Sequence, residues 1–238
     1  ALVLDAATTA DNNTAVGFNA GSTITTGSEN TILGGSALDA LTTGTNNVAI
    51  GYRALTLATT SSNNTAVGKD ALLANTTGAS NTAVGEEALA ANTTASHNIA
   101  VGREALKVNT TGAQNVAVGN FSLDANTTAS NNTAMGYAAL TGNTTASNNT
   151  AVGTNALFEN TTGNSNVAIG SHALDANTTG VENVAVGRHA GSAITTGSDN
   201  VFVGDLAGQV QTTASNNTGI GSFALNANTT GGQNTAVG

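Results

Sequence analysis

The stretch Asn132-Thr133-Ala134-Met135-Gly136 contains the pattern that decides the fold. The pattern is Asn, then Thr, Val or Ile, then usually Ala, then an aliphatic residue and Gly, and it recurs every 17 residues. Its closing glycines are Gly17, Gly34, Gly51, Gly68, Gly85, Gly102, Gly119, Gly136, Gly153, Gly170, Gly187, Gly204, Gly221 and Gly238, so 14 copies account for all 238 residues. A short fixed period without insertions is typical of solenoids, in which each repeat stacks on its neighbours. The sequence therefore predicts an all-β chain, a parallel β-solenoid or β-roll of 14 coils of 17 residues, with residues 1–238 forming a single repeat domain.

Composition excludes several classes of function. The chain has 5 Lys and Arg against 14 Asp and Glu and no basic patch, so we expect no nucleic-acid partner. No apolar run approaches about 20 residues, so we expect no membrane insertion within this segment. With no Cys and three His, the chain offers no recognisable catalytic set, and we expect neither enzymatic activity nor a cofactor. The absence of Pro agrees with a backbone that is paired along most of its length.

Side-chain alternation divides each repeated strand into two faces. Counting from the closing Gly as position 0, residues −3 and −1 point to one side and residues −4 and −2 to the other. We interpret the aliphatic −1 position, for example Val118, as the inner core. The Ala column at −2 is then a contact surface for other chains, and it is present in 11 of 14 repeats, with the exceptions Ile32, Phe202 and Gly219.

The remaining part of the repeat carries a second apolar position. Ala-Leu at +3 and +4 predicts a second core column at +4. Three repeats have Gly instead of this Leu, and apolar volume returns within three residues, as in the pairs Gly21 and Ile24, Gly191 and Ile194, and Gly208 and Val210. We predict a second extended segment with a bend near +5, and a short helical or 3₁₀ turn is the alternative. The Thr-Thr pair at +8 and +9 predicts a strand end that enters a tight turn.

Asn occupies position −4 in every repeat. Identical amides stacked in register can hydrogen bond from coil to coil, because a primary amide is both donor and acceptor. The alternative is a local role in the turn before the strand. The predicted structural ladder comprises Asn13, Asn30, Asn47, Asn64, Asn81, Asn98, Asn115, Asn132, Asn149, Asn166, Asn183, Asn200, Asn217 and Asn234.

Most of the histidine, charged and aromatic residues that could form a site lie at positions +1 and +2. His172 and His189 occupy +2 in consecutive coils and are either half of a metal site or two tolerated loop residues. An acidic +2 column is flanked by Lys69 and Arg103, which indicates a surface with salt bridges rather than a Ca²⁺ site; its members are Asp70, Glu87 and Glu104. Aromatic residues are candidates for surface contacts or for packing at the edge of the core: Phe18, Tyr52, Phe121, Tyr137, Phe158 and Phe223.

These motifs resemble a known family. Asn-Val-Ala-Val-Gly at 115–119 and Asn-Val-Ala-Ile-Gly at 47–51 and 166–170 are similar to the Ser-Val-Ala-Ile-Gly motif of YadA-type trimeric autotransporter adhesin heads, and the similarity extends over the whole chain. The resemblance implies a left-handed parallel β-roll, three chains side by side, and display on a bacterial surface to bind host matrix or other cells. Asn-Thr-Ala-Val-Gly and Ala-Leu-x-x-Asn-Thr-Thr-Gly repeats also resemble the shafts of phage tail fibres.

We therefore expect a structural and adhesive segment of a longer extracellular fibre, on a cell surface or a virion, that associates as a side-by-side homotrimer. Its partners would be copies of itself and a host-surface receptor or matrix. The alternative is a self-assembling filament subunit with a purely mechanical role, whose copies join end to end. Ice binding by the Thr columns is a third hypothesis, which is disfavoured because adjacent Thr8 and Thr9 would face opposite sides of a strand.

Overall fold

Every repeat forms one short β-strand followed by turns. The computed structural model describes residues 3–238, which divide into two compact units, residues 3–115 and 116–238. The strands of the first unit are β1 (Thr14–Val16), β2 (Thr31–Leu33), β3 (Val48–Ile50), β4 (Thr65–Val67), β5 (Thr82–Val84) and β6 (Ile99–Val101). Those of the second are β7 (Val116–Val118), β8 (Thr133–Met135), β9 (Thr150–Val152), β10 (Val167–Ile169), β11 (Val184–Val186), β12 (Val201–Val203), β13 (Thr218–Ile220) and β14 (Thr235–Val237).

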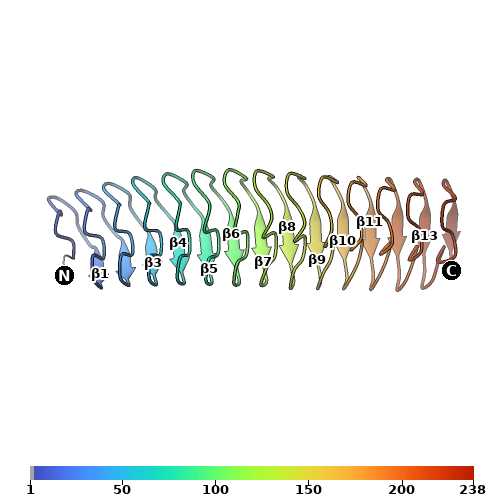
Figure 1. Ribbon diagram of the computed structural model, residues 1–238, viewed down its shortest axis with the longest axis horizontal. Helices are drawn as coiled ribbons and strands as arrows, with labels where there is room; N and C mark the ends of the chain where they lie inside the picture. The colour runs from blue at the N-terminus through green and yellow to red at the C-terminus, as the bar shows by residue number, and fades with distance from the viewer. Residues whose placement is uncertain (1–2) are drawn as a thin grey trace. The chain divides into compact units, whose positions relative to one another are not determined.

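Within each unit the strands pair in chain order, parallel and without any shift in register. On β4 and β5, for example, Thr65 lies opposite Thr82 and Ala66 opposite Ala83. Residues at the same repeat position therefore stack in columns, and Figure 1 shows the coils following one another within each unit. No helix is present among residues 3–238. The predicted all-β parallel solenoid with a 17-residue period is confirmed.

The predicted inner face of the strand is wrong. Ala66 and Ala117 at −2 are fully buried, whereas the −1 residues Val67 and Val118 are partly exposed and Val16 is 58% exposed. The Ala column is thus the core and the −1 column lies outside. The physical reason is the narrow interior of a 17-residue coil, which already holds a Leu and one or two Asn side chains, so most −2 positions have room for only a methyl group.

The Leu column at +4 is confirmed as core, and Leu72 and Leu106 are fully buried beside Ala71 and Ala105. Where Gly replaces this Leu, Ile24 and Ile194 are also fully buried, as the sequence predicts.

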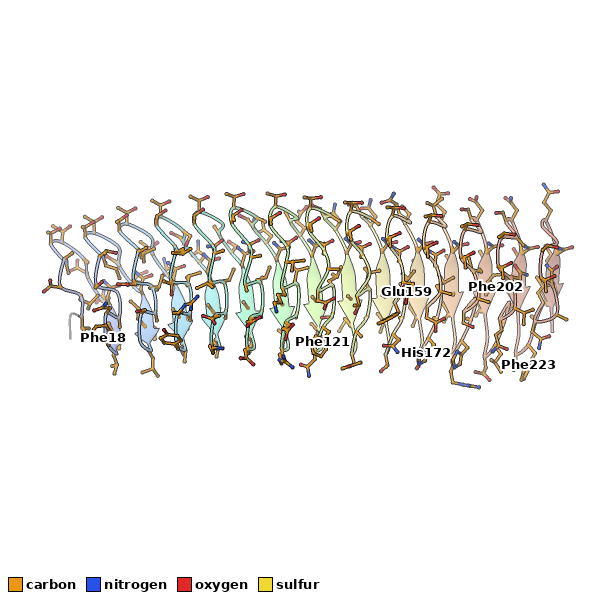
Figure 2. All side chains as sticks on the ribbon, viewed as in Figure 1. Phe18, Phe121, Glu159, His172, Phe202 and Phe223 are labelled. Atoms are coloured by element: carbon orange, nitrogen blue, oxygen red, sulfur yellow. The ribbon has the colours of Figure 1, made fainter. Side chains whose placement is uncertain are left out.

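The third repeat with Gly at +4 differs from the prediction. Val210, which was expected to replace the apolar volume missing at Gly208, is 38% exposed. The ring of Phe202 fills the space beside Gly208 instead, and a Cβ atom at Gly208 would lie 2.6 Å from Phe202 Cδ1. Gly191 and Gly219 border the same ring, since their Cβ atoms would lie 3.2 Å and 3.1 Å from it. Phe202, labelled within the second unit in Figure 2, is the one aromatic ring in residues 3–238 that is completely buried.

Positions +1 to +6 are a run of turns, so the predicted second extended segment is absent from residues 3–238. Asp70 at +2 and Leu72 at +4 have φ of 57° and 52°, and the other coils repeat these left-handed residues. The amide of Asp70 donates to Tyr52 O of the preceding coil at 3.0 Å, and that of Leu72 donates to Ala88 O of the following coil at 3.0 Å. Reversing φ at alternate residues costs of order 1 kcal/mol each for non-Gly residues, and these coil-to-coil bonds offset that cost.

The closing Gly and the first Thr of the Thr-Thr pair fix the two ends of the turn region. Gly51 has φ +134°, and a Cβ atom there would lie 2.5 Å from Gly68 O. Both the backbone angle and the close approach therefore require Gly. At +8, Thr76 Oγ1 donates to Thr93 O of the next coil at 3.0 Å. The hydroxyl of the +8 Thr thus adds a further bond between coils.

Candidate functional site

The Asn residues at −4 form a buried, continuous set of hydrogen bonds within each unit. Asn64 donates to Asn47 Oδ1 through its backbone N at 3.1 Å and through Nδ2 at 3.3 Å. Its Nδ2 also donates to Gly78 O at 2.9 Å, and its Oδ1 accepts from the backbone N of Asn81 at 2.9 Å. The Asn64 side chain therefore bonds to Asn47 in the preceding coil and to Gly78 and Asn81 on the following side. A residue that acted only in its local turn would not need these contacts.

The same arrangement recurs in the second unit, where Asn183 N donates to Asn166 Oδ1 at 2.9 Å and Asn183 Nδ2 to Gly197 O at 2.8 Å. Twelve of the 14 predicted ladder residues are buried, and the less buried members are Asn13 and Asn234. A buried amide without partners would cost about 1 to 3 kcal/mol, so this column stabilises the stacking only because it is continuous.

A second Asn ladder, at +7, is not among the residues that the sequence pattern singled out. Asn92 Nδ2 donates to Asn75 Oδ1 at 2.9 Å, and Asn109 Nδ2 donates to Asn92 Oδ1 at 3.2 Å. In the second unit Asn126, Asn143, Asn160 and Asn177 continue the same pattern, with Nδ2 to Oδ1 distances of 3.0, 3.1 and 2.8 Å. The recurrence of Asn at +7 is the sequence signal that could have indicated it.

A surface group of eight charged side chains, which we call the ionic cluster, covers +1, +2 and +5 of the first unit. Its members are Arg53, Lys69, Asp70, Glu86, Glu87, Arg103, Glu104 and Lys107. Arg53 Nε lies 3.2 Å from Asp70 Oδ1, and Lys107 Nζ lies 2.6 Å from Glu87 Oε2 and 3.1 Å from Glu104 Oε2. The interpretation of the acidic column as a surface with salt bridges is confirmed.

Lys107 also changes the titration of Glu87. The hydrogen bond that Lys107 donates to Glu87 lowers the pKa of the Glu87 carboxyl, and the hydrogen bonds that Lys107 donates to Glu87 and Glu104 raise the pKa of Lys107. The contribution of the Lys107–Glu87 pair to the free energy of unfolding is therefore present above the ordinary pKa of Glu. It is lost as the pH falls through the lowered pKa of Glu87. Both groups are solvent accessible, so this effect on stability is small.

Lys107→Met is expected to raise the pKa of Glu87 toward its ordinary value, because the hydrogen bond that favours the carboxylate is lost. Carboxyl ¹³C NMR titration measures this shift directly. Lys69→Met is the control, since Lys69 acts on Glu87 only through a longer-range attraction and should produce a smaller change. An unchanged Glu87 titration in the Lys107 variant would contradict the assignment.

His172 and His189 are stacked face to face, with ring centroids 4.9 Å apart and planes inclined by 9°. His172 Nδ1 lies 3.0 Å from Asp175 Oδ2. Parallel stacked rings direct their nitrogens side by side rather than toward a common point. Residues 3–238 contain no group of three or more His, Asp or Glu side chains placed to hold a metal ion.

The aromatic candidates lie at the surface to different extents. Phe121, His172 and Phe223, all at +2, follow one edge of the second unit in Figure 2. The most exposed rings are Phe18 at 65%, Tyr52 at 55%, Tyr137 at 55% and Phe223 at 52%. Phe121 and Phe158 are half-buried. Phe121 makes an edge-to-face contact with Tyr137, with the ring centroids 5.9 Å apart. Four of the six rings are therefore accessible for contacts.

An apolar surface is formed by the −1 column, which we call the outer aliphatic column. It consists of Val16, Leu33, Ile50, Val67, Val84 and Val101 in the first unit and Val118, Met135, Val152, Ile169, Val186, Val203, Ile220 and Val237 in the second. Leu33 is 49% exposed, Met135 44% and Ile169 40%. Single exposed aliphatic residues are ordinary, but an uninterrupted row of them marks a contact surface.

The chain matches no protein-family model and no curated protein. A search of residues 3–238 for a helix that could cross a membrane finds none.

Proposed function

We propose that this chain is a structural and adhesive segment of an extracellular fibre, in which copies of the chain associate side by side through their outer aliphatic columns. The proposed assembly is a homotrimer, and the proposed role is the head or stalk of a surface adhesin or the shaft of a phage tail fibre. The observation that carries the proposal is the aliphatic row on the outside of the parallel sheet in each unit.

The outer aliphatic column supports lateral association because the apolar surface that it can bury between chains grows with every coil. Covering half of one Val or Ile side chain contributes about 1 kcal/mol. Association of proteins costs about 4 to 15 kcal/mol in lost freedom of motion, which one or two coils cannot supply. A long row of coils in matched register can, and the unshifted pairing of β7 with β8 and of its successors keeps the row straight within a unit.

The adhesive part of the proposal rests on the exposed rings. Tyr52, Tyr137 and Phe223 each expose more than half of their surface, and aromatic rings of this kind supply contact area at low conformational cost. A host-surface receptor or matrix is the proposed partner. Mechanical strength would come from the ladder at −4, which joins every coil to the next within a unit, and from the ladder at +7, which joins the successive coils that carry Asn there.

Ile169→Asp combined with Val186→Asp is expected to convert a stable trimer into monomers that keep their β-sheet circular dichroism. The charges would be desolvated in the assembly but remain hydrated in the free chain, where both residues are partly exposed. Native mass spectrometry measures the stoichiometry. Thr145→Asp is the control, because Thr145 at +9 is exposed and lies outside the outer aliphatic column. A monomeric wild type, or an unchanged stoichiometry in the double variant, would show that the proposed interface is wrong.

A further inference from the structure

The second unit contains an open groove that follows from the stacking register. Position +6 is occupied in four successive coils by Glu159, Ala176, Ala193 and Val210. Two small residues between two longer ones leave a hollow of about 770 Å³, which these four side chains line. Glu159 and Val210 are three coil steps apart, at about 4.8 Å for each step. The groove is therefore long enough for an extended side chain of several methylene groups.

The walls of this groove supply hydrogen-bond acceptors and one aromatic ring. Phe158 and Asp175 at +5 line it, together with Asn155 at +2. Asn155 Oδ1 is buried and has no hydrogen-bond partner within residues 3–238. Because this oxygen has almost no solvent-accessible surface, the acceptors that a ligand in the groove can reach are the carboxylates of Glu159 and Asp175. The Glu159 carboxylate is exposed, and no described cation pairs with it.

The charge of the unit favours a positively charged occupant. Val116–Gly238 contains six Asp and Glu side chains and a single Lys or Arg, Arg188. The guanidinium of Arg188 is already paired, with Nε 3.0 Å from Asp205 Oδ1. Apart from His172, which contacts Asp175, the groove is lined by no basic side chain of the described residues. An incoming cation therefore meets carboxylates without a resident Lys or Arg to compete.

We propose that the groove between Glu159 and Val210 binds an organic cation, a primary ammonium or guanidinium group carried on an alkyl stem. Glu159 accepts a charge-assisted hydrogen bond from the cation, and the Phe158 ring offers its electron-rich face. The stem lies over the methyl groups of Ala176 and Ala193, which gives it apolar contact.

This cation can come from a Lys or Arg side chain of another protein or from a free polyamine. Heteronuclear NMR titration of the whole chain distinguishes them, with N-acetyl-lysine amide and spermidine as probes and N-acetyl-norleucine amide as the uncharged control. We expect saturable shifts at residues 155–159 and 172–176 with a cationic probe and none with the control. Tighter binding of capped lysine indicates a protein segment, and tighter binding of spermidine indicates a polyamine; either result supports the site. Equal binding of the uncharged control, or no saturable shifts with either cation, would overturn the proposal.

Two matched pairs of variants test the geometry. Glu159→Gln is expected to weaken binding at least about tenfold, whereas Glu182→Gln, which removes the same charge from an exposed site outside the groove, should leave it unchanged. Ala176→Leu fills the hollow and should abolish binding, whereas Ala125→Leu makes the same change at +6 away from it. Equal weakening by both Gln variants would mean that the cation is attracted only by net charge, and binding that survives Ala176→Leu would exclude the groove. The circular dichroism of each variant reports its folding separately.

Discussion

Replacing Asn64 by Asp is expected to lower the melting temperature strongly at neutral pH. The substitution removes the Nδ2 that donates to Gly78 O at 2.9 Å and to Asn47 Oδ1 at 3.3 Å. It places a carboxylate oxygen against those two acceptors in a site with no solvent exposure. Leaving a buried charge unpaired costs several kcal/mol, which is a large share of the stability of a typical domain.

The same variant should recover much of its stability at about pH 3. Burial and the facing acceptors favour the protonated acid, so they raise the pKa of this Asp in the folded state above its unfolded value of about 3.9. Protonation then restores a donor, and the deficit is smallest below the unfolded pKa and grows as the pH rises toward the folded pKa. Thermal unfolding followed by circular dichroism at both pH values measures the difference.

Asn63→Asp is the matched control for this prediction. Asn63 is adjacent, exposed and left-handed at φ 62°, a conformation that Asp tolerates, so its replacement should change the melting temperature little. If Asn64→Asp were as stable as Asn63→Asp at neutral pH, the −4 column would act only in the local turn and not as a ladder.

Gly208→Leu is expected to destabilise the second unit although Leu is the usual residue at +4. Leu at this position normally adopts φ near that of Gly208, which is +60°, so the backbone is not the obstacle. The obstacle is the Phe202 ring, because a Cβ at Gly208 would lie 2.6 Å from Cδ1 and Cε1 of that ring. Overpacking of this kind costs about 1 to 3 kcal/mol.

Phe202→Ala alone should cost more, about 3 to 5 kcal/mol, because Gly191, Gly208 and Gly219 cannot fill the space that the ring leaves. The double variant restores the usual Ala at −2 and Leu at +4, and it should be more stable than Phe202→Ala. Chemical denaturation of the four proteins gives the coupling energy, which is expected to be favourable and of the roughly 0.5 to 3 kcal/mol size seen for residues in contact. Additive single effects would show that the two positions do not share one space.

The sequence alone determined the features that depend on the repeat itself. The 17-residue spacing of Gly51, Gly68 and their equivalents predicted the number of coils and the parallel register, since identical segments in a solenoid lie opposite one another. Leu72 at +4 was recognised as core because Leu recurs at this position in most repeats. The Asn at −4 was recognised as a stacked column because identical residues stack in register and a primary amide can bond to its own copy in the next coil.

Only the tertiary structure decided which face of the strand lies inside. Alternation separates Ala66 from Val67 but is symmetric with respect to inside and outside, and the larger residue is the natural assignment for a core. The width of the closed coil reverses that assignment, because Leu72 and the Asn ladders already occupy the interior and leave space for Ala. The outer aliphatic column follows from this reversal. Contacts between coils also placed Phe202 among its three glycines and opened the groove at Ala176, since both depend on the particular side-chain sizes that meet where neighbouring coils pack.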